Sequence, residues 1–72
     1  YSILEMKPPH DWWNKTLQGI NVRGVYGVNV LAVKKSGVKE LLISLHGDYL
    51  VEKEDVLIVM GETAALERIN RS

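Results

Sequence analysis

The stretch VNVLAVKK (28–35) is the clearest candidate for a β-strand in this chain of 72 residues. A second stretch, DVLIVM (55–60), has the same character, because its apolar residues follow one another without a polar break. Strands with one exposed face alternate apolar and polar residues, whereas strands covered on both faces carry continuous apolar runs. The two stretches therefore predict strands that are buried on both faces.

Shorter strands are predicted outside these two runs. Residues 1–7 alternate apolar and polar side chains, and Pro8-Pro9 ends the alternation because proline cannot continue a strand ladder. Ser36-Gly37 is typical of a hairpin turn, which predicts a returning strand over 38–45. Residues 49–51 are expected to form a short extended piece.

Helical segments complete the pattern. Residues 15–20 predict a short helix, and Asn21 can cap a further turn over 22–26 that Gly27 ends. A closing helix is expected from its cap, Thr63, onward. The order strand, helix, strands, helix predicts an α+β fold, in which two short helical segments cover one face of a small, mostly antiparallel β-sheet.

The second face of such a sheet needs another cover, because two short helices cover one face at most. A second copy of the chain is the expected cover, since two-fold dimers are the commonest oligomers. A neighbouring domain is the rival cover, and simple exposure of some edge side chains is a third interpretation. We therefore expect a homodimer.

Composition excludes several classes of protein. Nine Lys and Arg residues balance nine Asp and Glu residues, so the chain has no electrostatic footprint for nucleic acid or an anionic membrane. The absence of cysteine excludes disulfides and thiolate zinc sites and fits a cytosolic setting. No apolar run approaches the roughly 20 residues that span a bilayer. The chain opens with Tyr1 and has no charged leader, so no signal peptide is expected in it. Its start without Met suggests a domain of a longer protein.

No catalytic or metal-binding pattern is visible in the sequence. His10 and His46 lie far apart, and no acidic cluster has the spacing of a metal site. The serine and threonine side chains have no histidine placed to activate them as nucleophiles. We therefore expect neither an enzyme nor a resident metal or cofactor.

Arg23 and Asn29 are the most informative polar residues. Arg23 follows a helix cap in a glycine-flanked turn, and its planar guanidinium suits phosphate or carboxylate. Asn29 interrupts the start of an apolar strand, where its amide can hydrogen-bond a base edge or the backbone. A local ion pair for Arg23 and a turn-capping role for Asn29 explain the same residues equally well. For Trp12-Trp13, packing on two different surfaces is favoured over a platform that stacks a ligand.

The ordered set of stretches KTL (15–17), INVR (20–23), YGVNVLAVK (26–34), GDYLV (47–51) and DVLIVMG (55–61) resembles one known family. This family is the C-terminal regulatory domain (RCK_C or TrkA_C) of Trk- and Ktr-type potassium uptake regulators, with relatives in cation/proton antiporters. The resemblance covers nearly the whole chain. It implies that residues 1–72 form a single cytosolic domain that dimerises and follows a nucleotide-binding Rossmann domain absent from this chain. It also implies a ring of full-length subunits under a membrane channel subunit.

The resemblance also implies a ligand, because some members bind the second messenger cyclic di-AMP across the two-fold axis of their dimer. Carried over to this sequence, the polar contacts are Arg23 and Asn29. The apolar walls around adenine and ribose are Leu17, Val22, Gly24, Val25 and Val28. Binders of cyclic di-AMP usually have a proline where this chain has Leu45, which keeps an apolar contact but changes the shape of the pocket.

Two other functions remain open at this point. The domain can be a structural dimerisation module of the same gating assembly, without a ligand of its own. It can also be an amino-acid sensor of similar α+β build that is attached to an enzyme. Binding of a ligand by the isolated domain separates the first of these alternatives from a sensor of cyclic di-AMP.

Overall fold

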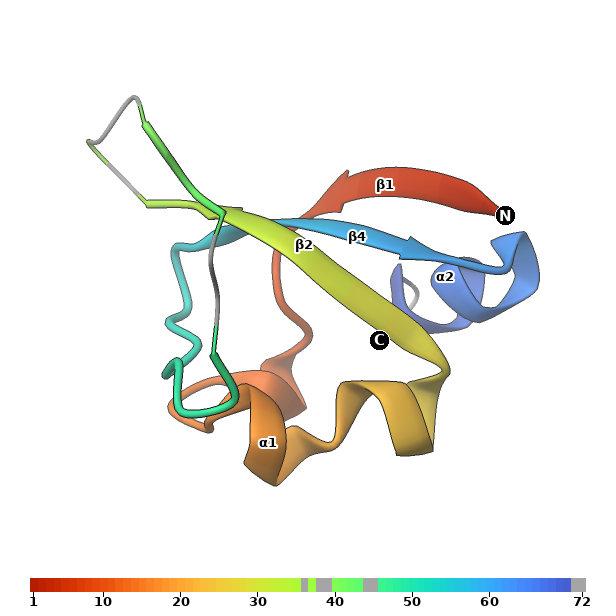
Figure 1. Ribbon diagram of the computed structural model, residues 1–72, viewed down its shortest axis with the longest axis horizontal. Helices are drawn as coiled ribbons and strands as arrows, with labels where there is room; N and C mark the ends of the chain where they lie inside the picture. The colour runs from red at the N-terminus through yellow and green to blue at the C-terminus, as the bar shows by residue number, and fades with distance from the viewer. Residues whose placement is uncertain (36, 38–39, 44–45, 71–72) are drawn as a thin grey trace.

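The fold was obtained as a computed structural model, and its description is given for residues 1–35, 37, 40–43 and 46–70 (Figure 1). In chain order its elements are β1 (Ser2–Met6), the 3-10 turn η1 (His10–Trp12), α1 (Leu17–Ile20), the π-helical turn η2 (Val22–Tyr26), β2 (Val28–Lys34), β3 (Leu41–Leu42), β4 (Val56–Gly61) and α2 (Thr63–Asn70). The predicted order of strand, helix, strands and helix is confirmed.

The strands form one antiparallel sheet in the order β1-β4-β2-β3. The two apolar runs of the sequence are its central strands, β2 and β4. Their register shifts by one residue between Val30 and Ala32, which places a bulge at Leu31. Of the strand predicted over 38–45, the described residues contain β3, which pairs with Val33 and Lys34.

A single hydrophobic core lies between the sheet and its helical segments. Trp12 from η1, Val59 from β4, and Leu66 and Ile69 from α2 all belong to one cluster of buried residues. Figure 1 shows α1 and the turn that follows it on one side of β2 and β4. The prediction that helical segments cover one face of the sheet is therefore confirmed.

The opposite face of the sheet is only partly covered. Side chains alternate between the two faces of a strand. Leu4, Val59 and Val30 pair with one another and pack on the core, so Ile3 and Met60 lie on the other face. Ile3 is 63% exposed there. In one protomer the central strands are thus buried on one face only. The burial on both faces predicted from the sequence would require a second copy of the chain or another domain on the exposed face.

The capping residues between α1 and β2 behave as predicted. Asn21 adopts a left-handed backbone conformation with φ 57°, and its side chain accepts a hydrogen bond from the Gly24 amide at 3.2 Å. Gly27, with φ 72°, ends η2 in the same left-handed region, which glycine adopts without a steric penalty.

The start of α2 differs from the prediction. Thr63 is the first residue of the helix rather than its cap, and the Glu62 carbonyl accepts the bond from the Leu66 amide at 3.0 Å. The Thr63 hydroxyl instead hydrogen-bonds Ser2 of β1 at 2.8 Å. This long-range partner ties the helix to the sheet edge. No helix within the described residues is long and apolar enough to cross a membrane.

The two adjacent tryptophans face different surroundings, as expected. Trp12 is fully buried and meets the Tyr26 ring edge-on, with 5.2 Å between ring centroids. Trp13 is half-buried, and its indole nitrogen donates to the Pro8 carbonyl at 3.2 Å. Both tryptophans are explained by packing.

Candidate functional site

A shallow groove of about 340 Å³ lies beside Arg23 and is called here the Arg23 groove. Its lining residues come from α1, from η2 and from the segment that follows β3: Leu17, Gln18, Asn21, Val22, Arg23 and Gly47. Leu17 and Val22 give the groove an apolar wall, while Arg23 places a permanent positive charge on its rim. This combination can hold a ligand that has a flat apolar part and a negative charge.

The wall contributed by α1 depends on contacts outside the helix. α1 has four residues, and an isolated helix of this length is unstable in water. Thr16 caps it by accepting a hydrogen bond from the Gly19 amide at 3.0 Å. The Leu17 amide donates to the Tyr49 carbonyl at 3.0 Å and the Gln18 amide to the Gly47 carbonyl at 2.8 Å. Backbone donors that a helix start usually leaves unpaired are thus bonded to a neighbouring loop.

Arg23 and Asn29, the two polar residues proposed from the sequence, lie next to each other. Arg23 Nε donates to Asn29 Oδ1 at 3.0 Å. Among the described residues, no carboxylate lies within ion-pair distance of the Arg23 guanidinium. Its terminal nitrogens therefore keep their capacity to bind an anion, while the bond through Nε fixes the side chain in place.

The other predicted site residues do not all line the same groove. Leu17 and Val22 line the groove. Val25 is 66% exposed and lines a different hollow, toward α2, with Tyr26, Ala65, Arg68 and Ile69. Val28 is 1% exposed and belongs to the core. In a single protomer these two valines therefore offer no wall to the groove.

Gly24 and Leu45 complete the predicted set. A Cβ atom at Gly24 would lie 2.5 Å from Asn21 Nδ2, so this position accommodates the capping side chain of Asn21. Leu45 lies outside the described residues. Gln18 and Gly47 were not predicted as groove residues, because they meet only through contacts between α1 and a distant loop.

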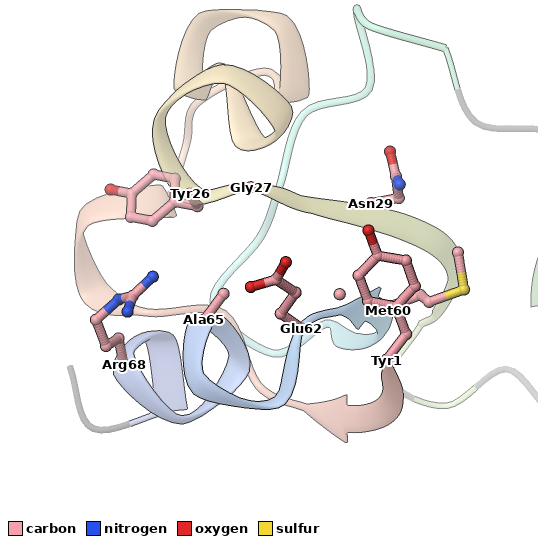
Figure 2. Close-up of a pocket in the computed structure, with 9 residues that line it drawn as sticks. Tyr1, Tyr26, Gly27, Asn29, Met60, Glu62, Ala65 and Arg68 are labelled. Atoms are coloured by element: carbon pink, nitrogen blue, oxygen red, sulfur yellow. The ribbon is translucent and has the colours of Figure 1, made fainter.

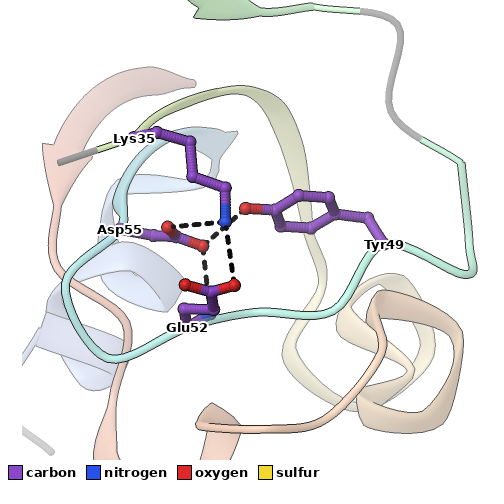
Figure 3. A network of polar contacts seen from close by, with 4 residues as sticks. All are labelled: Lys35, Tyr49, Glu52 and Asp55. Atoms are coloured by element: carbon purple, nitrogen blue, oxygen red, sulfur yellow. Dashed lines mark hydrogen bonds and ion pairs between the residues drawn. The ribbon is translucent and has the colours of Figure 1, made fainter. Parts of the chain in front are cut away.

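A polar cluster around the buried Asp55, called here the Asp55 cluster, contains Lys35, Tyr49, Glu52 and Asp55 (Figure 3). Asp55 is 1% exposed. Its carboxylate accepts bonds from the Tyr49 hydroxyl at 2.6 Å and from the Glu52 amide at 3.0 Å. Lys35 Nζ lies 3.2 Å from Asp55 Oδ1 and 3.4 Å from Glu52 Oε1. The buried charge is therefore both paired and hydrogen-bonded.

Two pKa values in the Asp55 cluster depart from their ordinary range. Burial raises the pKa of the Tyr49 phenol, and the hydrogen bond to Asp55 raises it further. Burial by itself would lower the pKa of Lys35, but hydrogen bonds to Tyr49 and Asp55 and the charge of Asp55 outweigh it and raise this pKa. Both side chains therefore hold their protons to higher pH than in an unfolded chain.

A second hollow of about 280 Å³, called here the Glu62 hollow, includes Asn29 in its wall (Figure 2). Its lining residues are Tyr1, Tyr26, Gly27, Asn29, Met60, Gly61, Glu62, Ala65 and Arg68. Figure 2 shows the Glu62 carboxylate pointing into this space. Within the described part of the chain, no group of three His, Cys, Asp or Glu residues is placed to hold a metal ion.

Several known proteins match nearly the whole of this chain. Ktr system potassium uptake protein C of Bacillus subtilis (strain 168) is 28% identical over 71 residues, which cover 99% of this chain and 31% of the relative. The RCK C domain of the potassium transport protein KtrA, solved in complex with cyclic di-AMP, is 30% identical with a TM-score of 0.84. That match covers 97% of this chain and 80% of the KtrA chain. This chain thus spans about a third of the length of the curated relatives that it matches.

The RCK_C domain dimer of BusR from S. agalactiae, also in complex with cyclic di-AMP, superimposes with a TM-score of 0.82 at 16% identity. It covers 99% of this chain and 93% of the BusR chain, and at this identity it shows the fold alone. A longer BusR structure contains promoter DNA. The TrkA-C domain family matches residues 2–72, and the chain therefore belongs to this family.

Proposed function

We propose that this chain is a ligand-sensing regulatory domain of a potassium transport system and that it binds cyclic di-AMP in the Arg23 groove. The observation that carries the proposal is the Arg23 guanidinium, which Asn29 holds at the rim of an apolar groove. Arginine binds phosphate through charge-assisted hydrogen bonds, and an apolar wall suits a purine. The KtrA relative that contains this ligand supports the choice of nucleotide.

The proposal includes a homodimer with one ligand on its two-fold axis. The Arg23 groove is shallow, so it leaves much of a bound nucleotide uncovered until a second copy closes over it. Cyclic di-AMP is itself two-fold symmetric, so two copies of one groove can receive its two halves in the same way. The BusR domain dimer, which shares this fold and contains cyclic di-AMP, is a structural precedent for this arrangement.

Regulation then follows from the difference in affinity between two dimer arrangements. A ligand shifts a conformational equilibrium only by as much as it prefers one state over the other. We propose that cyclic di-AMP favours the dimer arrangement that reduces ion flux, and that a full-length cytoplasmic ring transmits this change to a membrane transport subunit. The name of the Ktr relative supports potassium as the ion.

A structural dimerisation module without a ligand is the second candidate function. The positions of Val25 and Val28 favour it, because both valines lie away from the Arg23 groove and leave it with fewer apolar walls than the resemblance implies. The absence of nucleic-acid binding by this domain, expected from its balanced charge, stays a prediction.

Isothermal titration of the 72-residue chain with cyclic di-AMP tests both candidates. The proposed function predicts saturable binding at micromolar nucleotide with one ligand for two chains. AMP and cyclic di-GMP serve as controls for the charge and for the base, and both should bind more weakly. No heat at micromolar cyclic di-AMP would discard the sensor and leave the dimerisation module.

A further inference from the structure

Segment 47–51 holds the α1 wall of the Arg23 groove through backbone hydrogen bonds. Besides the bonds to Leu17 and Gln18, its Val51 carbonyl accepts from the Asn14 amide at 2.8 Å, and its Val51 amide donates to the Lys15 carbonyl at 2.8 Å. Leu50 and Thr16 form an isolated antiparallel bridge. A ladder of backbone bonds therefore runs along one side of residues 14–18, and the position of α1 follows the position of this segment.

Apart from Tyr49 and Val51, the residues of segment 47–51 make few buried contacts. Leu50 is exposed, as are Gly47 and Asp48, so these residues bury little apolar surface. The Tyr49 amide bonds the His46 carbonyl at 3.0 Å, which is a local turn contact. The Tyr49 ring packs against the core, and its hydroxyl reaches Asp55, the residue before β4, at 2.6 Å.

Asp55 is in turn anchored on two sides. It lies directly before β4, and its carboxylate pairs with Lys35, the residue directly after β2. Lys35 Nζ also lies 5.0 Å from the centre of the Tyr49 ring, at the distance of a cation–π contact. Figure 3 shows the three side chains converging from these separate segments. The central strands are thereby linked through Asp55 and Tyr49 to the backbone that carries α1.

We infer that Tyr49 and Asp55 are positioning residues for the ligand site, acting through the backbone of segment 47–51 on the α1 wall of the Arg23 groove. Neither side chain lines the groove. The Tyr49 carbonyl holds the Leu17 amide, and the Tyr49 hydroxyl fixes that carbonyl relative to the sheet. This inference rests on the proposed function, because it assigns these residues to the affinity of the same site.

The Tyr49→Phe substitution tests the inference, because it removes the hydroxyl bond to Asp55 and keeps the ring. Affinity for cyclic di-AMP is expected to fall by about fivefold, a fraction of what a hydrogen bond to a charged group is worth. Without ligand, amide exchange at Leu17 and Gln18 should accelerate by about tenfold, and by more than exchange at Val59 in β4, which follows global stability.

Two control variants separate positioning from general destabilisation. Tyr1→Phe removes a hydroxyl from an exposed tyrosine outside the groove and should leave affinity unchanged. Ile69→Val weakens the core through α2, away from the groove, and should lower stability without changing affinity.

Each outcome decides one question. Unchanged affinity in Tyr49→Phe, beside measurable binding by the natural sequence, would overturn the inference and keep the proposed function. Equal losses of affinity in Tyr49→Phe and Ile69→Val would also overturn it. If the natural sequence fails to bind, the proposed function falls, and with it the link to affinity. A larger acceleration of exchange at Leu17 and Gln18 than at Val59 would then still establish the mechanical link, and equal acceleration at all three would remove it.

Discussion

Arg23 Nε donates a hydrogen bond to Asn29 Oδ1 at 3.0 Å, across the turn that joins η2 to β2. The bond uses the inner nitrogen of the guanidinium and leaves the two outer nitrogens to other partners. Arginine side chains lose much rotational freedom when they bind a ligand, and a side chain that is already fixed loses less. In the proposed site, Asn29 therefore holds Arg23 in a position to bind an anion.

The first prediction separates the two roles by a double-mutant cycle. Arg23→Ala should weaken binding of cyclic di-AMP by roughly 1.5–3 kcal/mol, the range for a hydrogen bond to a charged group. Asn29→Ala should cost about 1 kcal/mol, and the double variant less than the sum, because Asn29 acts through Arg23. Calorimetric titration of the four proteins measures the coupling. Lys7→Ala is the control for loss of a surface cation away from the groove. Strict additivity would mean that the two residues bind independently.

The second prediction concerns the cap that shapes η2. A Cβ atom at Gly24 would lie 2.5 Å from Asn21 Nδ2 and 2.7 Å from Asn21 Oδ1, so Gly24→Ala must displace the capping side chain. The expected loss of unfolding free energy is about 1–2 kcal/mol, the range for loss of an N-cap. Urea denaturation followed by circular dichroism measures it.

Asn21→Gly provides the matched background for this test. Glycine tolerates the left-handed conformation of residue 21 and costs only a few tenths of a kcal/mol as a cap. In that background Gly24→Ala should cost much less, because no side chain remains to be displaced. An equal cost in both backgrounds would show that the collision with Asn21 is not the cause.

The third prediction concerns the buried charge of Asp55. Asp55→Ala removes the acceptor for Tyr49 and for the Glu52 amide and leaves Lys35 without its buried partner. Lys35 is 27% exposed and keeps its pair with Glu52, so the expected loss lies at the low end of the cost of breaking a buried ion pair, about 3 kcal/mol. Glu54→Ala is the control, since its ion pair with Lys7 joins two exposed side chains and should be worth less than about 1 kcal/mol. Equal losses in the two variants would contradict the role given to burial.

Local chemistry explains which parts of the fold could be predicted from the sequence. Asn21 and Gly27 were identified as caps because each acts on backbone within a few residues of itself. The start of α2 was misplaced because the Thr63 hydroxyl is used by Ser2, which is 61 residues away in the chain. A partner at that distance leaves no signal in the local sequence.

The same distinction holds for the candidate site. Arg23 and Asn29 were found from their residue types, and a short turn then brings them together. Gln18 and Gly47 were missed because they become neighbours only when segment 47–51 docks on α1. The burial of Val28 follows from the register of β2 against β4, in which Val28 pairs with Gly61. A continuous apolar run in the sequence does not show which residues of two strands will pair.

The last prediction concerns stability at alkaline pH. Tyr49 and Lys35 both have pKa values above their ordinary values of 10.0 and 10.5 in the folded protein. Above about pH 10 the unfolded chain therefore loses these protons while the folded protein keeps them. Stability falls with rising pH wherever the folded state binds more protons. The contribution of the Asp55 cluster is thus complete below pH 10 and declines as the pH rises toward the raised pKa values.

Urea denaturation at pH 7, 9, 10 and 11 measures this decline, and Tyr49→Phe identifies its source. The variant lacks the phenol and the bond that supports the Lys35 ammonium, so its unfolding free energy should start lower at pH 7 and fall less steeply above pH 10. Tyr1→Phe, which changes an exposed ring, should follow the natural protein at every pH. Parallel curves for the natural protein and Tyr49→Phe would show that alkaline loss of stability arises outside the Asp55 cluster.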